Sequence, residues 1–232
     1  MVLPLSDDNS GRSSIPIVTW SIIILNVIVF FVLQGGGTNT VFTYAYSTVP
    51  AEIVSGRDFV TEHRIIRKTN QHGQVDQYQA PGLQATPIPV YFTLVTSMFM
   101  HGGLMHLVGN MWFLWIFGDN IEHDMGPFRY LVFYLFCGIA ASLAHVLLNA
   151  TGTNAEIPCL GASGAISAVM GAYLILHPKR RVTVLLLRVV TQVPGYVAVG
   201  LWFLFQVVSG LAKFGGTAAG IAYGAHIGGF VI

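Results

Sequence analysis

Two residues that can form a hydrolytic pair stand in strongly apolar stretches of this chain. Ser163 lies between small residues at the start of an apolar run, and His226 lies near the end of the chain in the run GAHIGG. A serine hydroxyl becomes an activated nucleophile when a histidine accepts its proton. A histidine within a membrane also needs a partner, and no acid stands on its own segment. The two residues therefore indicate nucleophilic catalysis if the fold brings them together.

Two further polar residues share one helical face. His106 and Asn110 are four residues apart, so on a helix their side chains lie one turn apart on the same side. Taken alone, such a pair is more often a hydrogen-bonded contact between membrane helices, and a Gly-x-Ser-Gly run is more often a helix-packing surface. The convergence of all these residues is what indicates a functional site. We expect His101 and His145 to be interface or structural residues.

The composition indicates a lipid environment. Hydrophobic residues make up 53% of the chain and charged residues 9%, against about 25% in a typical soluble domain, and the mean hydropathy is +0.65. We therefore expect an integral membrane protein. The net charge of +1 gives no basis for nucleic-acid binding. Cys137 and Cys159 have neither the number nor the spacing of a zinc site or a disulfide framework, so we expect buried free thiols and no metal or cofactor.

Apolar windows of about 20 residues predict an all-α bundle of six transmembrane helices. The expected order is a cytoplasmic tail (1–14), the first helix (15–34), a long extracytoplasmic or interfacial loop (35–92) and a core (93–232). Within the core we expect helices at about 104–118, 127–148, 163–177, 194–211 and 216–232. The first helix is predicted to stay uncleaved, because it is too long for the apolar part of a signal peptide. The sixth is still apolar at Ile232, so we expect the natural protein to continue.

Basic residues set the expected orientation. The loop between the fourth and fifth helices carries Lys179, Arg180, Arg181 and Arg188, which predicts that this loop and the N-terminus are cytoplasmic. The loop 35–92 is then outside. The segment 182–192 is apolar but interrupted by polar residues, and we expect it to lie along the membrane surface.

The fourth helix is too short to span the hydrocarbon core. From Ser163 to His177, about 15 residues extend roughly 22 Å, against a core of about 30 Å. Ser163 should therefore lie below the outer surface, where irregular backbone must be covered by protein or reached by water. His106 and Asn110 are expected at a similar depth, as is His226, which lies roughly 15 Å into its helix. We expect a polar cavity open to the extracytoplasmic side.

Small residues predict close packing of the fourth and sixth helices. They recur every four residues at Gly216, Gly220, Gly224 and Gly228, and again at Ser163, Ser167 and Gly171. Such ridges let helix backbones approach closely in lipid. If the ridges face each other, His226 comes within hydrogen-bond reach of Ser163. The acids Asp119, Glu122 and Asp124 lie at the cytoplasmic end of the second helix, so the expected hydrolase is a Ser-His dyad without an acid.

Four motifs together resemble the rhomboid family of intramembrane serine proteases. They are His101-Gly-Gly-Leu-Met-His106-Leu-Val-Gly-Asn110, Gly118-Asp-Asn-Ile-Glu122, Gly161-Ala-Ser163-Gly164 and Gly224-Ala-His226-Ile-Gly-Gly229. The similarity covers roughly Pro89 to the C-terminus. It implies a six-helix bundle that hydrolyses peptide bonds in or next to the transmembrane segments of other membrane proteins, with membrane lipid around it.

The resemblance also implies roles for individual residues. Ser163 is the expected nucleophile, and His226 is the expected general base and later the acid for the leaving amine. His106 and Asn110, with the backbone N–H of Ser163, are expected to form the oxyanion hole. Backbone N–H groups at a helix start suit that role, because they are unsatisfied and carry the positive end of the dipole. Glu122 matches a position that holds loops together. The glycines of the matching motifs include Gly161, Gly164 and Gly224.

Two positions depart from the pattern of the family. Some rhomboids stack a tyrosine, four residues after the nucleophile, on the catalytic histidine, whereas this chain has Ser167 there. Some bacterial members carry a Trp-Arg pair in the first loop, where residues 89–92 stand here. Two alternatives stay open, namely a catalytically silent rhomboid-like protein that binds transmembrane helices and a transporter that uses intramembrane histidines. The compact layout leads us to expect a bacterial plasma membrane, and the sequence does not predict the oligomeric state.

Overall fold

The computed structural model describes residues 2–69, 75–186, 188–213 and 223–232, and most of them are helical. The longer helices are α1 (Ile17–Ile28, continued by a π-helical turn at Val29–Leu33), α5 (Leu104–Met125), α6 (Pro127–Leu148), α7 (Ser163–Leu176) and α8 (Gly195–Lys213). The shorter ones are α2 (Thr40–Ala45), α3 (Pro50–Ser55), α4 (Thr93–Thr96), α9 (Tyr223–Val231) and 3-10 turns at Gly35–Gly37, Val90–Phe92, Ser97–Phe99 and Gly152–Asn154. The start of the predicted sixth helix, with Gly216 and Gly220, lies outside the described residues.

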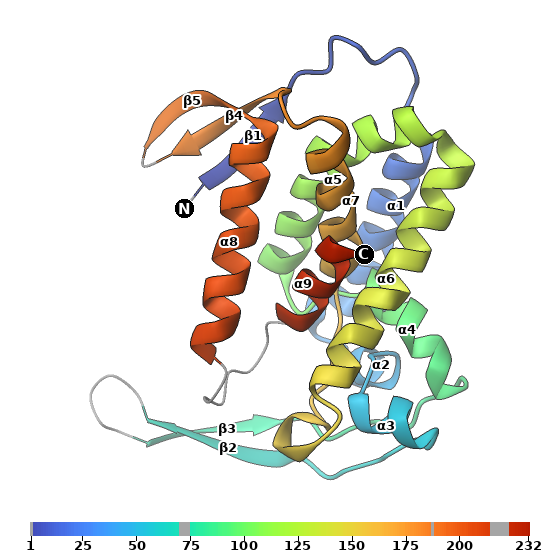
Figure 1. Ribbon diagram of the computed structural model, residues 1–232. Coiled ribbons are helices and arrows are strands. Elements are labelled where there is room, and N and C mark those ends of the chain that lie inside the picture. The colour runs from blue at the N-terminus through green and yellow to red at the C-terminus, as the bar shows by residue number, and fades with distance from the viewer. Residues whose placement is uncertain (1, 70–74, 187, 214–222) are drawn as a thin grey trace.

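The helix α7 lies at the centre of the bundle. It packs against α5, α6, α8 and α9, and Figure 1 shows it among them. Every residue from Gly164 to Gly171 is buried, because the small side chains of this helix let neighbours approach on all sides. The core around it is formed by large apolar side chains that include Leu114, Phe117, Tyr130, Tyr134, Val169, Met170 and Tyr173.

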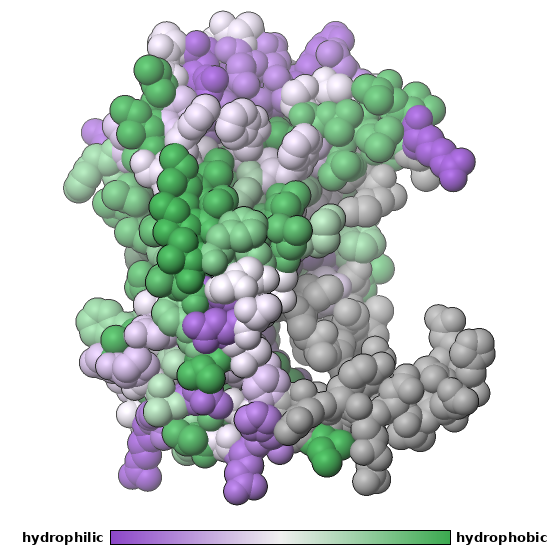
Figure 2. Space-filling model, turned by 180° about the vertical axis from the view of Figure 1, so that it is seen from behind, coloured by the Kyte–Doolittle hydropathy of each residue, from purple (hydrophilic) through white to green (hydrophobic). Residues whose placement is uncertain are grey.

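Apolar side chains cover much of the outer surface. The helices α1, α5, α6 and α8 expose large apolar residues such as Phe31, Trp115, Phe136 and Phe205. In Figure 2, apolar side chains gather across the middle of one face and hydrophilic side chains at its two ends. Exposed apolar surface of this extent suits contact with lipid.

Length and hydropathy single out one helix of the described residues. Pro127–Leu148 is long and apolar enough to cross a membrane by itself. Shorter apolar helices lie at Ile17–Leu33, Val90–Phe99, Ser163–Leu176 and Gly195–Val208. The polar last turns of α5 keep that helix out of this group, although it is as long as α6.

The expectation of an all-α protein is wrong in the N-terminal tail and in two loops. The strands β1 (Val2–Asp7), β4 (Arg181–Leu186) and β5 (Val189–Pro194) form an antiparallel sheet in the order β1-β4-β5, and β2 (Arg64–Thr69) pairs with β3 (Val75–Ala80). The segment 182–192 therefore forms most of a hairpin, and its position along the membrane surface stays a prediction. Its alternating side chains explain the hairpin, because Val182 and Val184 are fully buried while their neighbours are not.

The polar end of α5 binds the start of α1. The structure extends the predicted helix 104–118 to Met125, and the added turns carry Glu122. The Glu122 carboxylate accepts hydrogen bonds from the backbone N–H groups of Val18 (2.8 Å) and Thr19 (2.7 Å). Because Pro16 at the N-cap of α1 makes no side-chain hydrogen bond, this carboxylate satisfies donors that the helix itself leaves unpaired.

Asp7 of β1 lies in a polar junction between the sheet and the bundle. Its Oδ2 accepts hydrogen bonds from the Tyr173 hydroxyl (3.0 Å) and from Asn120 Nδ2 (2.6 Å), while Arg180 donates to Asn120 Oδ1. Burial and the nearby Asp119 carboxylate raise the pKa of Asp7 to about 6, against the opposing effect of the hydrogen bond from Tyr173. The protonated carboxyl is thus favoured more strongly in the folded protein than in the unfolded chain.

We expect the wild-type protein to lose stability between pH 5 and pH 7.5 relative to an Asp7→Asn variant. Because the folded pKa of Asp7 lies above the unfolded value, its stabilising contribution is complete below about pH 3.8 and is lost as the pH rises through about 6. Asparagine keeps both accepted hydrogen bonds and cannot ionise. The difference in Tm between variant and wild type, measured in detergent, should therefore grow as the pH rises from 5 through about 6 and then level off.

The matched control for this prediction is Asp8→Asn. Asp8 is exposed and its pKa is lowered by the hydroxyl and backbone N–H of Ser10, so it stays ionised throughout this range. Its Tm difference from wild type should be constant between pH 5 and pH 7.5. A constant difference for Asp7→Asn as well would contradict the raised pKa of Asp7.

Candidate active site

Irregular backbone leads the chain to Ser163 at the first position of α7. Cys159 and Thr48 exchange two backbone hydrogen bonds (2.8 and 3.1 Å), and the N–H of Gly161 donates to the carbonyl oxygen of Ser97 (2.9 Å). These partners satisfy backbone groups that would be costly if left unpaired away from water. Gly161 has a φ of +127°, a conformation that a residue with a Cβ rarely adopts. The turn into α7 therefore requires glycine.

Ser163 and His226 are in hydrogen-bond contact. Ser163 Oγ lies 2.8 Å from His226 Nε2, which joins α7 to α9. The other ring nitrogen, His226 Nδ1, lies 2.8 Å from Oε1 of Gln206 on α8. Side chains from three helices thus form one chain of hydrogen bonds. This arrangement can activate the serine hydroxyl, because the imidazole nitrogen that faces it is able to accept its proton.

Close packing of α9 on its neighbours fixes this geometry. A Cβ added to Gly229 would lie 2.1 Å from the carbonyl oxygen of Gly164 on α7, so a larger residue would force the two helices apart. Gly224 and Gly228 instead face side chains of α6. The predicted ridges of the fourth and sixth helices therefore do not face each other at these two positions. The next residue, Gly229, makes the contact with α7. The small residues of α9 therefore pack against both α6 and α7.

His106 is placed to donate a hydrogen bond beside Ser163. Its Nδ1 accepts a hydrogen bond from the N–H of Gly102 (3.2 Å), so the proton of the neutral ring lies on Nε2. A Cβ added to Gly161 would lie 2.9 Å from His106 Nε2 and 3.7 Å from Ser163 Oγ. His106 Nε2 and Ser163 Oγ therefore approach the same point from two helices. His101 is fully buried, with its ring edge-on to that of His106 at 5.1 Å between centroids.

Asn110 lies one turn further along the same face of α5. Its side chain is buried, and its Nδ2 makes no hydrogen bond with the described residues. Most buried polar atoms are paired, so an unpaired amide donor one helical turn from His106 is a candidate for binding negative charge. The N-terminus of α7 adds backbone donors, because Ala162 at its N-cap provides no side-chain hydrogen bond.

The predicted residues divide into two groups in space. Ser163, His226 and His106 lie around the start of α7, and Asn110 lies one turn beyond His106 on α5. Glu122, also singled out by its motif, lies at the other end of α5 against α1. Within the described residues, no group of three or more His, Cys, Asp or Glu side chains is placed to hold a metal ion.

Gln206 is the residue near the dyad that sequence reasoning missed. It is a single amide in the apolar segment predicted as the fifth helix, and such an interruption was available as a signal. Ser167, which occupies the position where some relatives stack a tyrosine, donates its hydroxyl to the carbonyl oxygen of Ser163 (2.6 Å). The aromatic rings nearest to the His226 ring include Trp202 on α8 and Tyr223 on α9, with centroids at 6.3 and 6.2 Å.

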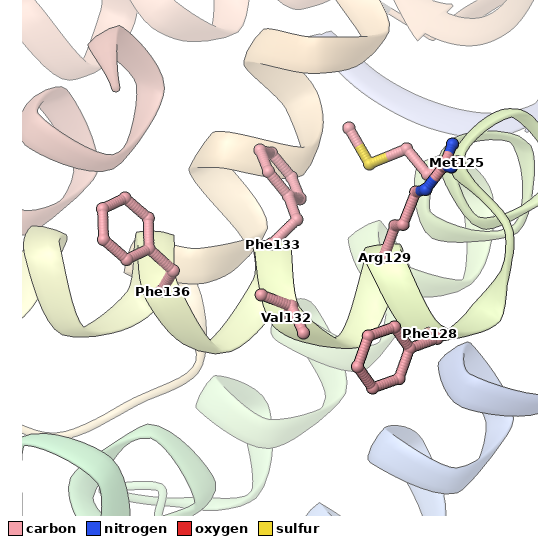
Figure 3. A pocket seen from close by; sticks show the side chains of 6 residues that line it. All are labelled: Met125, Phe128, Arg129, Val132, Phe133 and Phe136. Carbon is pink, nitrogen blue, oxygen red and sulfur yellow. The ribbon is translucent and has the colours of Figure 1, made fainter.

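An apolar groove on the outside of α6 is separate from these residues. It has a volume of about 390 Å³ and is lined by Met125, Phe128, Arg129, Val132, Phe133 and Phe136 (Figure 3). Apart from Met125, the last residue of α5, these side chains lie on the first half of α6, whereas the start of α7 packs on the second half, where Gly164 meets Ala141. The groove therefore contributes no side chain to the candidate active site.

Replacing Gly161 by alanine is expected to slow the reaction of Ser163 with a small fluorophosphonate about 10-fold, as a displacement of a few tenths of an ångström would. The added methyl group meets the His106 ring at 2.9 Å, and the residue has a positive φ, so both effects shift the start of α7. Gly109→Ala on α5 is the control, since a Cβ there meets nothing within 4 Å. Equal labelling rates for the two variants would contradict this interpretation of the site.

The sequence of the chain matches a known family of membrane proteins. The Rhomboid domain family matches residues 89–232, which is more than half of the chain, so the chain belongs to the rhomboid family. It is therefore a rhomboid-domain membrane protein, and its relatives include rhomboid proteases.

Three relatives illustrate the range of similarity. Presenilin-associated rhomboid-like protein, mitochondrial, of Mus musculus is 33% identical over 130 residues, covering 51% of this chain and 34% of that protein. Rhomboid protein 1, mitochondrial, of Saccharomyces cerevisiae is 32% identical over 155 residues (63% and 41%). Rhomboid protease GluP of Bacillus subtilis is 25% identical over 217 residues (92% and 35%). The chain thus spans well under half the length of these relatives.

Proposed function

We propose that this protein is an intramembrane serine endopeptidase that hydrolyses peptide bonds in or near the transmembrane segments of other membrane proteins. The observation that carries the proposal is the 2.8 Å contact between Ser163 Oγ and His226 Nε2. Homology to rhomboid proteases supports the same activity, and membership of the family implies membrane-protein substrates in general.

The proposed reaction uses one ring nitrogen throughout. Ser163 Oγ attacks the carbonyl carbon of the scissile bond while His226 Nε2 takes the hydroxyl proton. His226 then donates that proton to the leaving amine, the C–N bond breaks, and an acyl-enzyme forms at Ser163. In the second half of the reaction, Nε2 removes a proton from water, whose oxygen attacks the ester. The proton finally returns to Ser163 Oγ as the acid product leaves.

Three donors are proposed to stabilise the oxyanion of the tetrahedral intermediate. They are His106 Nε2–H, the amide of Asn110 and the backbone N–H of Ser163. Support comes from the Gly102 hydrogen bond that leaves the His106 proton on Nε2, and from the unpaired Nδ2 of Asn110. Donors fixed in a site of low dielectric constant stabilise developing charge without reorganising, which is the largest single contribution in many enzymes.

We further propose six transmembrane helices, a cytoplasmic N-terminus and an active site that opens to the extracytoplasmic side. The sheet with its basic residues and the loop region with α2 and α3 lie at opposite ends of the bundle (Figure 1). Basic residues favour the cytoplasmic side. The 14 residues of α7 extend roughly 21 Å from that side, short of the hydrocarbon core of about 30 Å, so water has a shorter path to Ser163 from outside.

The test is cleavage of a single-span membrane protein by the purified protein in liposomes. Mass spectrometry of the two products should place the cut in or beside the transmembrane segment. A catalytically silent relative would instead bind the substrate, detected by co-purification, and leave it intact. Intact substrate after prolonged incubation with folded wild-type protein, across a panel of transmembrane sequences, would contradict the proposal.

A further inference from the structure

We infer that Gln206 is the positioning residue of the dyad, whose side-chain carbonyl holds His226 in the one tautomer and orientation that can accept the proton of Ser163. This inference deepens the proposed function, and the expected effect of Gln206 on catalysis rests on that function. The position and tautomer of His226 do not depend on the proposed function, because the hydrogen bond from His226 to Gln206 exists in the resting protein.

The contact is direct and buried. Gln206 Oε1 lies 2.8 Å from His226 Nδ1, and the Gln206 side chain is 9% exposed. Trp202 lies one turn earlier on the same face of α8, with its ring tilted by 37° to the His226 ring. The helix α8 therefore contacts the imidazole twice, once by a hydrogen bond and once by an aromatic ring. A histidine on α9 is in this way oriented from a neighbouring helix.

The hydrogen bond also selects the tautomer. A side-chain carbonyl oxygen only accepts, so Nδ1 must carry the ring proton when it faces Gln206 Oε1. The lone pair of the neutral ring then lies on Nε2, which faces Ser163 Oγ at 2.8 Å. In the other tautomer Nε2 would carry a proton and could not accept one from the serine. Gln206 thus favours the competent form before any substrate arrives.

No carboxylate takes this role among the described residues that contact His226. In a Ser-His-Asp triad the acid holds the tautomer and also stabilises the imidazolium. A neutral amide does the first and adds no charge, which avoids the cost of an ionised group in a lipid-surrounded site. Ser167 on α7 does not contribute, because its hydroxyl is bonded to the backbone of Ser163. The orienting device of this chain therefore comes from α8.

The experiment compares two variants that remove the acceptor with one that keeps it. Gln206→Leu and Gln206→Met have similar volume and cannot accept the hydrogen bond, whereas Gln206→Glu can. We expect both apolar variants to lower kcat about 10- to 100-fold with unchanged KM. Reaction of Ser163 with a small fluorophosphonate, which needs no transmembrane docking, should slow by the same factor. Gln206→Glu should stay within a few-fold of wild type, and Leu204→Ala, a lipid-exposed change on α8, should match wild type.

A spectroscopic measurement reports the tautomer independently of activity. In protein with ¹⁵N-labelled histidine, the His226 signals, assigned by their loss in His226→Ala, should show a protonated Nδ1 and an unprotonated Nε2. The same pattern is expected for Gln206→Glu, and a mixture of tautomers for both apolar variants. The spectrum also shows whether each variant is folded, because the other histidine signals should not move.

The outcomes separate the two proposals. Wild-type kcat and an unchanged tautomer in the apolar variants would overturn the role of Gln206, while the proposed function would stand if Ser163→Ala is inactive. A raised KM with unchanged kcat would also overturn it, because Gln206 would then act in substrate docking. If the wild-type protein cleaves nothing, the proposed function fails, whereas a tautomer change in the apolar variants still supports positioning by Gln206.

Discussion

Replacing Ser163 by alanine is expected to abolish proteolysis. The variant keeps the α-helical start of α7 and loses only the hydroxyl that faces His226 Nε2 at 2.8 Å. Loss of the nucleophile of a serine protease lowers kcat by about 10⁴-fold or more, because no other group can form the acyl-enzyme. Cleavage of the single-span substrate in liposomes should therefore fall below detection.

Ser167→Ala is the matched control for that variant. It removes a hydroxyl from the same helix one turn later, where the group donates to a backbone carbonyl and does not face His226. Its kcat should stay within a few-fold of the wild-type value. Residual cleavage of more than a hundredth of the wild-type rate by folded Ser163→Ala protein would mean that the nucleophile lies elsewhere.

Replacing Asn110 by alanine is expected to lower kcat about 10²- to 10³-fold without lowering stability, as removal of one oxyanion donor does. Its Nδ2 is buried and has no hydrogen-bond partner among the described residues, so removing this donor breaks no hydrogen bond among them. The Tm should stay level or rise, while turnover falls. Single-turnover kinetics and thermal unfolding of the same preparation measure both quantities.

Asn120→Ala, on the same helix, is expected to have the opposite effects on Tm and kcat. Asn120 is buried and bonds to Asp7, Asn9 and Arg180 at the far end of α5. Its loss should lower the Tm and change kcat little. If Asn110→Ala lowered the Tm and left kcat unchanged, Asn110 would be a structural contact, which is the simpler interpretation of its motif.

The candidate site was accessible from the sequence because lipid restricts where polar residues can stand. Ser163 and His226 each interrupt an apolar run, and the helix predicted over 163–177 starts at the same residue as α7. The expected helix 127–148 has the same bounds as α6, where proline at the first position and apolar residues throughout leave few alternatives.

Contacts between residues far apart in the chain could not be predicted from the sequence. The strand β1 pairs with β4, about 180 residues later, and no local pattern in the tail 1–14 indicates this partner. Gln206 contacts His226 only because α8 and α9 pack side by side. In the sequence, Gln206 is only one polar residue in an apolar segment. The sequence likewise did not show which helix each glycine of α9 would face, because α9 has glycines in contact with both α6 and α7.

The most direct test of the account is the site at which an activated serine reacts. Wild-type protein in detergent would be incubated with a fluorophosphonate and digested, and the adduct would be located by tandem mass spectrometry. The proposed dyad predicts one adduct, on Ser163, and its loss in the His226→Ala protein. An adduct on another residue, or equal labelling of Ser163 in wild-type and His226→Ala protein, would contradict the dyad.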